Sequence, residues 1–297
     1  MLYFRWMRHL ILGLIIILSA SCKRSLYESD YHTMKHDGEK RSYLLHVPPS
    51  YSDATETPLI IALHGGVGSA KNIEEQSGLA EFSDEKGFIL CSPNGINRTW
   101  NAGWCCGKAQ EKEIDDVGFI SKLIDQLKTE YNIDANRVYI TGMSNGAMMS
   151  YRLACELSTE IAAIAPVAGG MVMDQCEPSS SVSIIHFHSY EDSNIPHLGG
   201  VGDGISDHYN APLDSIREFW SQQLECPIYT EIDLSTEVDI KMASGCLDSN
   251  EVVYYYTTDG GHSWPGGRAP TRKGDAPSEA LNANEVMWEF FMKHPKR

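Results

Sequence analysis

Short apolar runs alternate along this chain with segments whose apolar residues recur every three or four positions. A short apolar run that ends at glycine, proline or a polar turn predicts a buried strand. Such runs occur at residues 43–47, 59–63, 88–91, 138–140, 161–165, 182–187 and 252–256. The sequence therefore predicts a series of strands that are buried on both faces.

The intervening segments predict helices. Residues 116–131 carry apolar side chains at three- and four-residue steps, which is typical of a helix with one buried face. Further helices are expected over 147–154, 213–223 and 281–292. Continuous apolar strands separated by helices favour a mostly parallel sheet with helices on both faces. No internal repeat or linker divides residues 40–297, so we expect a single α/β domain there.

The N-terminus has the pattern of an export signal. Arg5 and Arg8 precede a short apolar run, residues 10–18, which small residues and then Cys22 follow. This run is too short to span a bilayer comfortably and predicts a signal peptide over residues 1–21. Cys22 is placed like the lipidated first residue of a bacterial lipoprotein. Because Ser19 stands where leucine is usual, plain secretion stays open.

Residues 22–39 are polar with little periodicity, and we expect a tether there, either lipid-anchored or free.

The whole chain has 297 residues and a formal net charge of −16, with 42% hydrophobic residues. This composition is ordinary for a globular protein with a real core. The acidic balance argues against nucleic acid as a partner and against a basic membrane-binding patch. We expect a monomer whose only membrane contact is a lipid on Cys22.

Cysteines in an exported protein are candidates for disulfides. Cys91 lies inside an apolar run and is expected to be a buried free thiol. Cys226 and Cys246 are expected to pair. The remaining candidates have no fixed connectivity: either Cys105 or Cys106 could join either Cys155 or Cys176. None of these residues has the spacing of a zinc site.

A serine between two glycines directly follows one of the apolar runs. The segment Gly142-Met143-Ser144-Asn145-Gly146 comes after residues 137–141 and before an expected helix. A serine hydroxyl needs a base to remove its proton, and a sharp strand-to-helix turn exposes the hydroxyl to one. Ser144 is therefore the candidate nucleophile. An ordinary helix-capping serine is the alternative.

A nucleophile on such a turn takes its acid and then its histidine from later in the chain. His262 lies in a glycine-flanked loop after the run 252–256, which is the position that the base requires. Asp192 follows the run 182–187 and begins a turn, so it is favoured as the acid that orients the imidazole. Glu191 is the second candidate. A surface histidine and solvated loop acids are the alternatives.

Acyl transfer also needs hydrogen-bond donors for the oxyanion. One is the backbone N–H of the residue after the nucleophile, here Asn145, and another comes from a loop after an early strand. The glycine-rich residues 64–68 follow the run 59–63, and Gly66 is favoured there over Val67. This loop lacks the pattern of a phosphate-binding motif. We expect no cofactor.

Two further groups of side chains are candidates for binding. His186 and His188, two apart on a strand, could bind a metal with His197 or His208, but histidines in such positions are more often packed and hydrogen-bonded, so we expect no metal site. The aromatic residues near the cysteine loop and near His262 are candidates for lining the substrate pocket, with plain packing as the alternative. They are Trp100, Trp104 and Trp264.

Taken together, these pieces resemble the polyhydroxybutyrate depolymerase and feruloyl esterase group of carbohydrate-esterase α/β-hydrolases. The matching motifs are LHGG at 63–66, WNAGWCCG at 100–107, DDVGF at 115–119, RVYITGMSNGA at 137–147, LAC at 153–155, APVAG at 165–169 and GGHSWPGG at 260–267. The resemblance implies the α/β-hydrolase fold and a Ser144–His262–Asp192 triad with Gly66 and Asn145 as oxyanion donors. Residues 189–192 read Ser-Tyr-Glu-Asp where the family usually has Gly-Thr-x-Asp.

The sequence thus predicts an exported serine esterase that acts on feruloyl or acetyl esters of plant polysaccharides or oligosaccharides. A polyester depolymerase is the alternative within the same chemistry. Two alternatives from other classes are a peptidase and a non-catalytic binding lipoprotein, both on the same fold. A non-catalytic binding lipoprotein would be expected to lack a residue of the triad, whereas all three residue types are present here.

Overall fold

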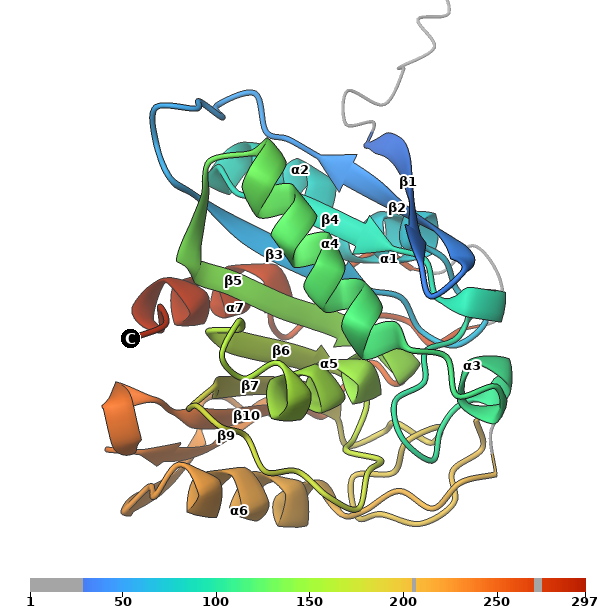
Figure 1. Ribbon diagram of the computed structural model, residues 1–297. Coiled ribbons are helices and arrows are strands. Elements are labelled where there is room, and N and C mark those ends of the chain that lie inside the picture. Colours follow the sequence, from blue (N-terminus) through green and yellow to red (C-terminus); the bar gives the residue numbers. More distant parts are fainter. Residues whose placement is uncertain (1–28, 205–206, 270–273) are drawn as a thin grey trace, which may run out of the picture.

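One ten-stranded sheet runs through the computed structural model, which describes residues 29–204, 207–269 and 274–297 (Figure 1). The strands are β1 (Asp30–His36), β2 (Glu39–His46), β3 (Thr57–Leu63), β4 (Ile89–Pro93), β5 (Ile133–Met143), β6 (Ala163–Val167), β7 (Ser183–Ser189), β8 (Ile228–Asp233), β9 (Val238–Ser244) and β10 (Val252–Thr257). Their order across the sheet is β1-β2-β4-β3-β5-β6-β7-β10-β9-β8. All neighbouring pairs between β4 and β10 are parallel. The outer pairs are antiparallel.

Helices cover both faces of this sheet. They are α1 (Ala70–Ser77), α2 (Leu79–Lys86), α3 (Gly107–Glu111), α4 (Asp116–Glu130), α5 (Asn145–Glu156), α6 (Leu213–Gln223) and α7 (Ala283–Lys293), with short 3₁₀ turns η1 (Ile96–Arg98) and η2 (Leu247–Ser249). Helices α4, α5 and α6 lie in front of the sheet in Figure 1, and α1, α2 and α7 lie behind it. None of the helices in the described ranges is both long enough and apolar enough to cross a membrane.

The two-faced core follows from the alternation of side chains along each strand. In β3, Leu59, Ile61 and Leu63 pack into the cluster under α4 and α5, whereas Ile60 and Ala62 pack into the cluster under α1, α2 and α7. All five side chains are fully buried. Because both faces of the strand are covered, its sequence is a continuous apolar run, and no polar residue alternates with the apolar ones. The predicted fold class is therefore confirmed.

Some elements were not predicted, and one prediction was wrong. Residues 30–36 were expected to belong to a polar tether, but they form β1, the outermost strand of the sheet, paired with β2. Most side chains of β1 are exposed, so the strand has no apolar run that would reveal it. The same reason applies to β8 at the opposite edge, where nearly every residue is exposed. The short helices α1 and α2 were also missed.

The disulfides differ in part from the expectation. Cys226 and Cys246 are paired as predicted, and they flank the β8–β9 hairpin at its open end. Cys155 pairs with Cys176, and Cys105 pairs with its neighbour Cys106, so the link considered possible between these two regions is not formed. Spacing alone could not choose among partners. Cys91 is a free, buried thiol, as predicted, and burial raises its pKa well above the usual value.

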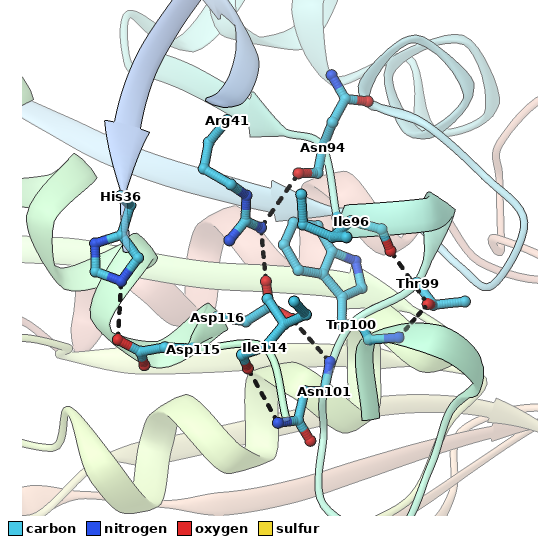
Figure 2. A network of polar contacts seen from close by, with 12 residues as sticks. His36, Arg41, Asn94, Ile96, Thr99, Trp100, Asn101, Ile114, Asp115 and Asp116 are labelled. Carbon is cyan, nitrogen blue, oxygen red and sulfur yellow. Dashed lines mark hydrogen bonds and ion pairs between the residues drawn. The ribbon is translucent and has the colours of Figure 1, made fainter. Parts of the chain in front are cut away.

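A buried ion pair ties the start of α4 to β2 and to the loop after β4 (Figure 2). Arg41 Nη2 lies 2.6 Å from Asp116 Oδ1, and the two side chains are 1% and 0% exposed. The second carboxylate oxygen of Asp116 accepts the Asn101 N–H at 2.8 Å. The Arg41 guanidinium also lies 3.8 Å from the centre of the Phe119 ring. Asp116 thereby fixes residues 100–101, which lead into the site described below.

Removing one member of this pair should destabilise the protein more than removing both. Asp116→Leu leaves a buried guanidinium without its counter-charge, and we expect the free energy of unfolding to fall by about 3–5 kcal/mol. Arg41→Met/Asp116→Leu removes both charges and should be the less destabilised of the two variants. Urea unfolding followed by circular dichroism measures both values. A double variant at least as unstable as Asp116→Leu would contradict this account.

Candidate active site

Ser144 stands on a sharp turn between β5 and α5. Its backbone has φ 57° and ψ −119°, a conformation that costs a non-glycine residue free energy and is found mainly at functional positions. The Ser144 N–H donates to the Val167 carbonyl at 2.9 Å. The Ser144 carbonyl accepts the Met148 N–H at 3.0 Å, which is the first hydrogen bond of α5. The surroundings therefore hold a strained turn in place. This is the geometry expected for a nucleophile elbow.

The glycines of the elbow allow the backbone of neighbouring elements to approach it. A Cβ atom on Gly146 would lie only 2.2 Å from the Leu63 carbonyl oxygen, and one on Gly142 would lie 2.5 Å from the Gly146 carbonyl oxygen. Both contacts are with backbone, which cannot rotate away as a side chain can. Side chains are therefore excluded at both positions.

The glycine-rich loop after β3 lies against Ser144. A Cβ atom on Gly65 would lie 3.3 Å from Ser144 Cβ, so the loop and the elbow are in direct contact. The buried His64 side chain fixes this loop: its Nδ1 lies 2.8 Å from the Gly65 carbonyl, and its Nε2 accepts the Gly95 N–H at 3.0 Å. Burial lowers the pKa of His64 to about 4, so the ring is neutral and Nδ1 carries the proton. Gly66 follows in this loop.

The structure brings Asp192 and His262 together. His262 Nδ1 lies 2.8 Å from Asp192 Oδ2, although the two residues are 70 positions apart in the chain. The other carboxylate oxygen, Oδ1, accepts the backbone N–H groups of Asn194 and Ile195, each at 2.9 Å. Glu191, the second candidate for the acid, is exposed instead. Asp192 thus uses one oxygen to hold its own turn and the other to orient the imidazole.

The charge of Asp192 is maintained despite its burial. Burial alone would raise the pKa of this carboxyl, but the hydrogen bond and charge of His262, with smaller contributions from His188 and the Ile195 N–H, lower it below the usual value. The side chain is 0% exposed. A buried carboxylate that stays ionised can fix the imidazole tautomer and stabilise an imidazolium.

The loop that carries His262 is anchored on both sides of the histidine. The His262 N–H donates to Asp275 Oδ2 at 2.7 Å, and Ser263 Oγ donates to the Ala276 carbonyl at 2.9 Å. Trp264 follows; its Nε1 donates to Asn284 Oδ1 at 2.9 Å, and the ring is 1% exposed. The backbone on both sides of the imidazole is therefore fixed by residues from the last part of the chain.

Two of the three tryptophans considered as candidates for the pocket lining are buried, in agreement with the alternative of plain packing. Trp264 is buried as described, and Trp100 is 0% exposed. Trp100 instead supports the elbow: its N–H donates to Asn145 Oδ1 at 2.7 Å, and its Nε1 donates to the His64 carbonyl at 2.9 Å. Trp104 is 41% exposed and is the one of the three that a substrate could contact. Composition could not distinguish a buried indole from an exposed one.

This role of Trp100 and Asn145 was missed by sequence reasoning. Asn145 was a candidate only for its backbone N–H, but its side chain also donates from Nδ2 to the Trp100 carbonyl at 3.1 Å. The pair therefore joins the nucleophile turn to the loop after β4. That loop is in turn held by Asp116 through Asn101 (Figure 2).

The histidines considered as metal ligands have other partners. His186 Nε2 and His188 Nδ1 lie 3.2 Å apart, and the other nitrogen of each ring contacts a tyrosine hydroxyl or a backbone carbonyl. In the described part of the chain, one group of side chains has ligand atoms close enough to share a metal: Cys105, Cys106 and His208. The two sulfurs are joined in a disulfide, whereas metals bind the thiolate.

The comparisons with known proteins bear first on the fold and then on the family. An acetyl xylan esterase from Aspergillus awamori superposes with a TM-score of 0.61 over 89% of this chain and 99% of that chain, at 14% sequence identity. At this identity the likeness concerns the fold alone. Together with the parallel sheet and the elbow, it shows that this protein has the α/β-hydrolase fold, as the sequence predicts.

The chain belongs to the esterase PHB depolymerase family, whose model matches residues 41–194. Feruloyl esterase C from Emericella nidulans is 28% identical over 260 residues, which is 85% of this chain and 84% of that protein. The bifunctional acetylxylan esterase/xylanase XynS20E from Neocallimastix patriciarum is 29% identical over 172 residues, 57% of this chain. The match spans only 24% of that relative's length. The family predicted from the sequence motifs is therefore confirmed.

The contact at Gly146 gives a direct test of the elbow geometry. We expect Gly146→Ala to lower the free energy of unfolding by about 3 kcal/mol or more, because the added methyl meets backbone that cannot move without breaking the sheet. Gly170→Ala is the matched control, since its Cβ would lie 3.4 Å from Ile216 Cδ1, an ordinary contact. Its stability should stay within about 1 kcal/mol of the wild type. Thermal and urea unfolding measure both variants; equal stability of the two would contradict the close approach.

Proposed function

We propose that this protein is a serine carboxylic-ester hydrolase, with Ser144 as nucleophile, His262 as general base and Asp192 as the acid that orients it. The observation that carries this proposal is the 2.8 Å hydrogen bond between Asp192 and His262 at the sheet edge where Ser144 stands on its strained turn. Membership of an esterase family supports the same chemistry.

The reaction proceeds in two acyl-transfer steps. His262 Nε2 takes the proton of Ser144 Oγ as the oxygen attacks the ester carbonyl, and the imidazolium then protonates the leaving alcohol. Water, deprotonated by the same nitrogen, hydrolyses the acyl-enzyme. Asp192 stays ionised throughout and holds the proton of His262 on Nδ1. The developing oxyanion is stabilised by the backbone N–H groups of Gly66 and Asn145.

We propose feruloyl or acetyl esters of plant polysaccharides or oligosaccharides as the substrates of this protein. The relatives named feruloyl esterase and acetylxylan esterase support this choice. Trp104, exposed on the loop after β4, is available to contact an aromatic acyl group or a sugar ring. Hydroxybutyrate polyester is the second candidate substrate, because the family is described as PHB depolymerase.

We propose that this protein is exported from the cytoplasm. Disulfides at Cys155–Cys176 and Cys226–Cys246 are consistent with an oxidising compartment. The signal peptide over residues 1–21 and the lipidation of Cys22 lie outside the described residues and belong to the proposal. The mature protein would act as a monomer that is either secreted or held at a membrane by that lipid, with the ester substrate as its partner.

Substitution at each triad position tests the mechanism. Methyl ferulate, acetylated xylan and hydroxybutyrate oligomers serve as substrates, and a peptide series tests for a peptidase. Ser144→Ala should lower kcat by roughly 10⁴-fold or more, and Asp192→Asn by roughly 10³–10⁴-fold, because an amide cannot fix the same imidazole tautomer.

Glu191→Gln is the matched control for Asp192→Asn, since Glu191 is the neighbouring acid and is exposed. Its kcat should stay within about twofold of the wild type, as for most surface changes. Undiminished activity of Ser144→Ala would refute the mechanism. A larger loss in Glu191→Gln than in Asp192→Asn would transfer the acid role to Glu191, and a wild type without any esterase activity would favour a binding protein.

A further inference from the structure

A chain of four buried rings connects the elements that carry the candidate triad. Tyr151 lies on α5, the helix that begins after Ser144, and Tyr254 lies on β10, the strand before His262. His186 and His188 lie on β7, the strand before Asp192. All four side chains are at most 1% exposed, and none belongs to the proposed mechanism so far. Buried polar groups of this kind need a physical explanation.

The four rings are hydrogen-bonded in one line that ends beside the acid. The Tyr254 and Tyr151 hydroxyls lie 2.8 Å apart, and Tyr151 Oη lies 2.9 Å from His186 Nδ1. His186 Nε2 lies 3.2 Å from His188 Nδ1, and His188 Nε2 lies 2.8 Å from the Ile195 carbonyl. The same His188 nitrogen lies 3.5 Å from Asp192 Oδ2.

The direction of every proton in this line follows from its last member. A backbone carbonyl can only accept, so His188 Nε2 must carry a proton. Burial lowers the pKa of His188 to about 4 and that of His186 well below its usual value, so both rings are neutral. His188 Nδ1 is then an acceptor, and His186 Nε2 must donate to it. His186 Nδ1 accepts in turn from the Tyr151 hydroxyl, which accepts from Tyr254.

We propose that this chain of rings positions Asp192 for ester hydrolysis, and that His188, His186 and Tyr151 are positioning residues of the site. The inference rests on the proposed function. The turn 192–195 holds Asp192 Oδ1 through its N–H groups, and His188 holds the same turn through the Ile195 carbonyl. His188 thereby helps to fix this turn, and the turn fixes Asp192 Oδ2, the oxygen that orients His262.

The far end of the chain provides a test that touches neither substrate nor triad. Tyr151→Phe removes the donor that holds His186 in its tautomer, so the ring can carry its proton on Nδ1 and present an acceptor to His188. Tyr139→Phe is the matched control: Tyr139 is equally buried, and its hydroxyl donates to the Phe291 carbonyl at 2.7 Å, in the core cluster on the opposite face of the sheet. Each variant removes one buried hydroxyl; Tyr151→Phe loses two hydrogen bonds, to His186 and Tyr254, and Tyr139→Phe loses the one to Phe291.

We expect kcat for methyl ferulate to fall roughly tenfold or more in Tyr151→Phe, as when a partner that orients a functional histidine is lost. KM should change less than about twofold, because the chain does not contact substrate. Tyr139→Phe should keep the wild-type kcat although its melting temperature falls, because the lost hydrogen bond lies away from the site. Equal kcat in the two variants at comparable stability would overturn the proposal.

His188 itself is tested by a conservative pair of variants. The amide of a glutamine side chain can present an N–H near the position of the imidazole Nε2, whereas leucine leaves the Ile195 carbonyl without a donor. We therefore expect His188→Gln to retain at least about tenfold more kcat than His188→Leu. Circular dichroism melts identify a variant that fails to fold. Equal loss in two folded variants would contradict a role through the Nε2 proton.

The tautomers can be measured without any activity assay. Nitrogen-15 NMR of the full protein labelled at histidine should find His186 and His188 neutral at about pH 7, each with its proton on Nε2. Either ring charged, or carrying its proton on Nδ1, would overturn the chain. If the wild type hydrolyses no ester, the proposed function fails, but this measurement still decides whether the chain of protons is as described.

Discussion

Parallel pairing of the central strands is the constraint on which the site depends. Because β3, β5, β7 and β10 run in one direction, their carboxyl ends meet at one edge of the sheet. The glycine-rich loop and the three members of the proposed triad each follow one of these ends. The strands are stabilised by two apolar layers, one on each face of the sheet. The loops can therefore hold the polar residues of the site without having to stabilise the fold. The polar side chains that the site requires are therefore placed by an apolar core.

The loops are positioned by buried polar contacts that differ in kind on the two sides of the nucleophile. On one side, the Arg41–Asp116 ion pair holds residue 101 (Figure 2). Trp100 joins the same loop to Asn145. On the other side, neutral rings support the turn of Asp192. Because His188 is neutral, it does not neutralise the negative charge of Asp192. That charge remains available to interact with His262.

The sequence could predict those parts of the fold and site that depend on local pattern. Every apolar run became a strand of the sheet, and Ser144 lies on the expected turn, because a run followed by a glycine-flanked serine specifies strand and turn together. The edge strands β1 and β8 escaped prediction because exposed strands need no apolar run. For Trp100 and Trp264 the sequence left packing and substrate contact both open, and the structure shows them buried. The ring chain was not predicted, because contacts between strands and helices far apart in the chain leave no periodic pattern.

Covalent labelling by a p-nitrophenyl phosphonate tests the central claim most directly, namely that Ser144 is a nucleophile activated by His262. Peptide mapping by mass spectrometry would locate the adduct, and release of nitrophenol would give its rate. The account predicts one phosphonyl group per protein, on Ser144, with the rate lowered by about a thousandfold or more in His262→Ala. An adduct on another residue, or labelling of Ser144 at an unchanged rate without the imidazole, would contradict it.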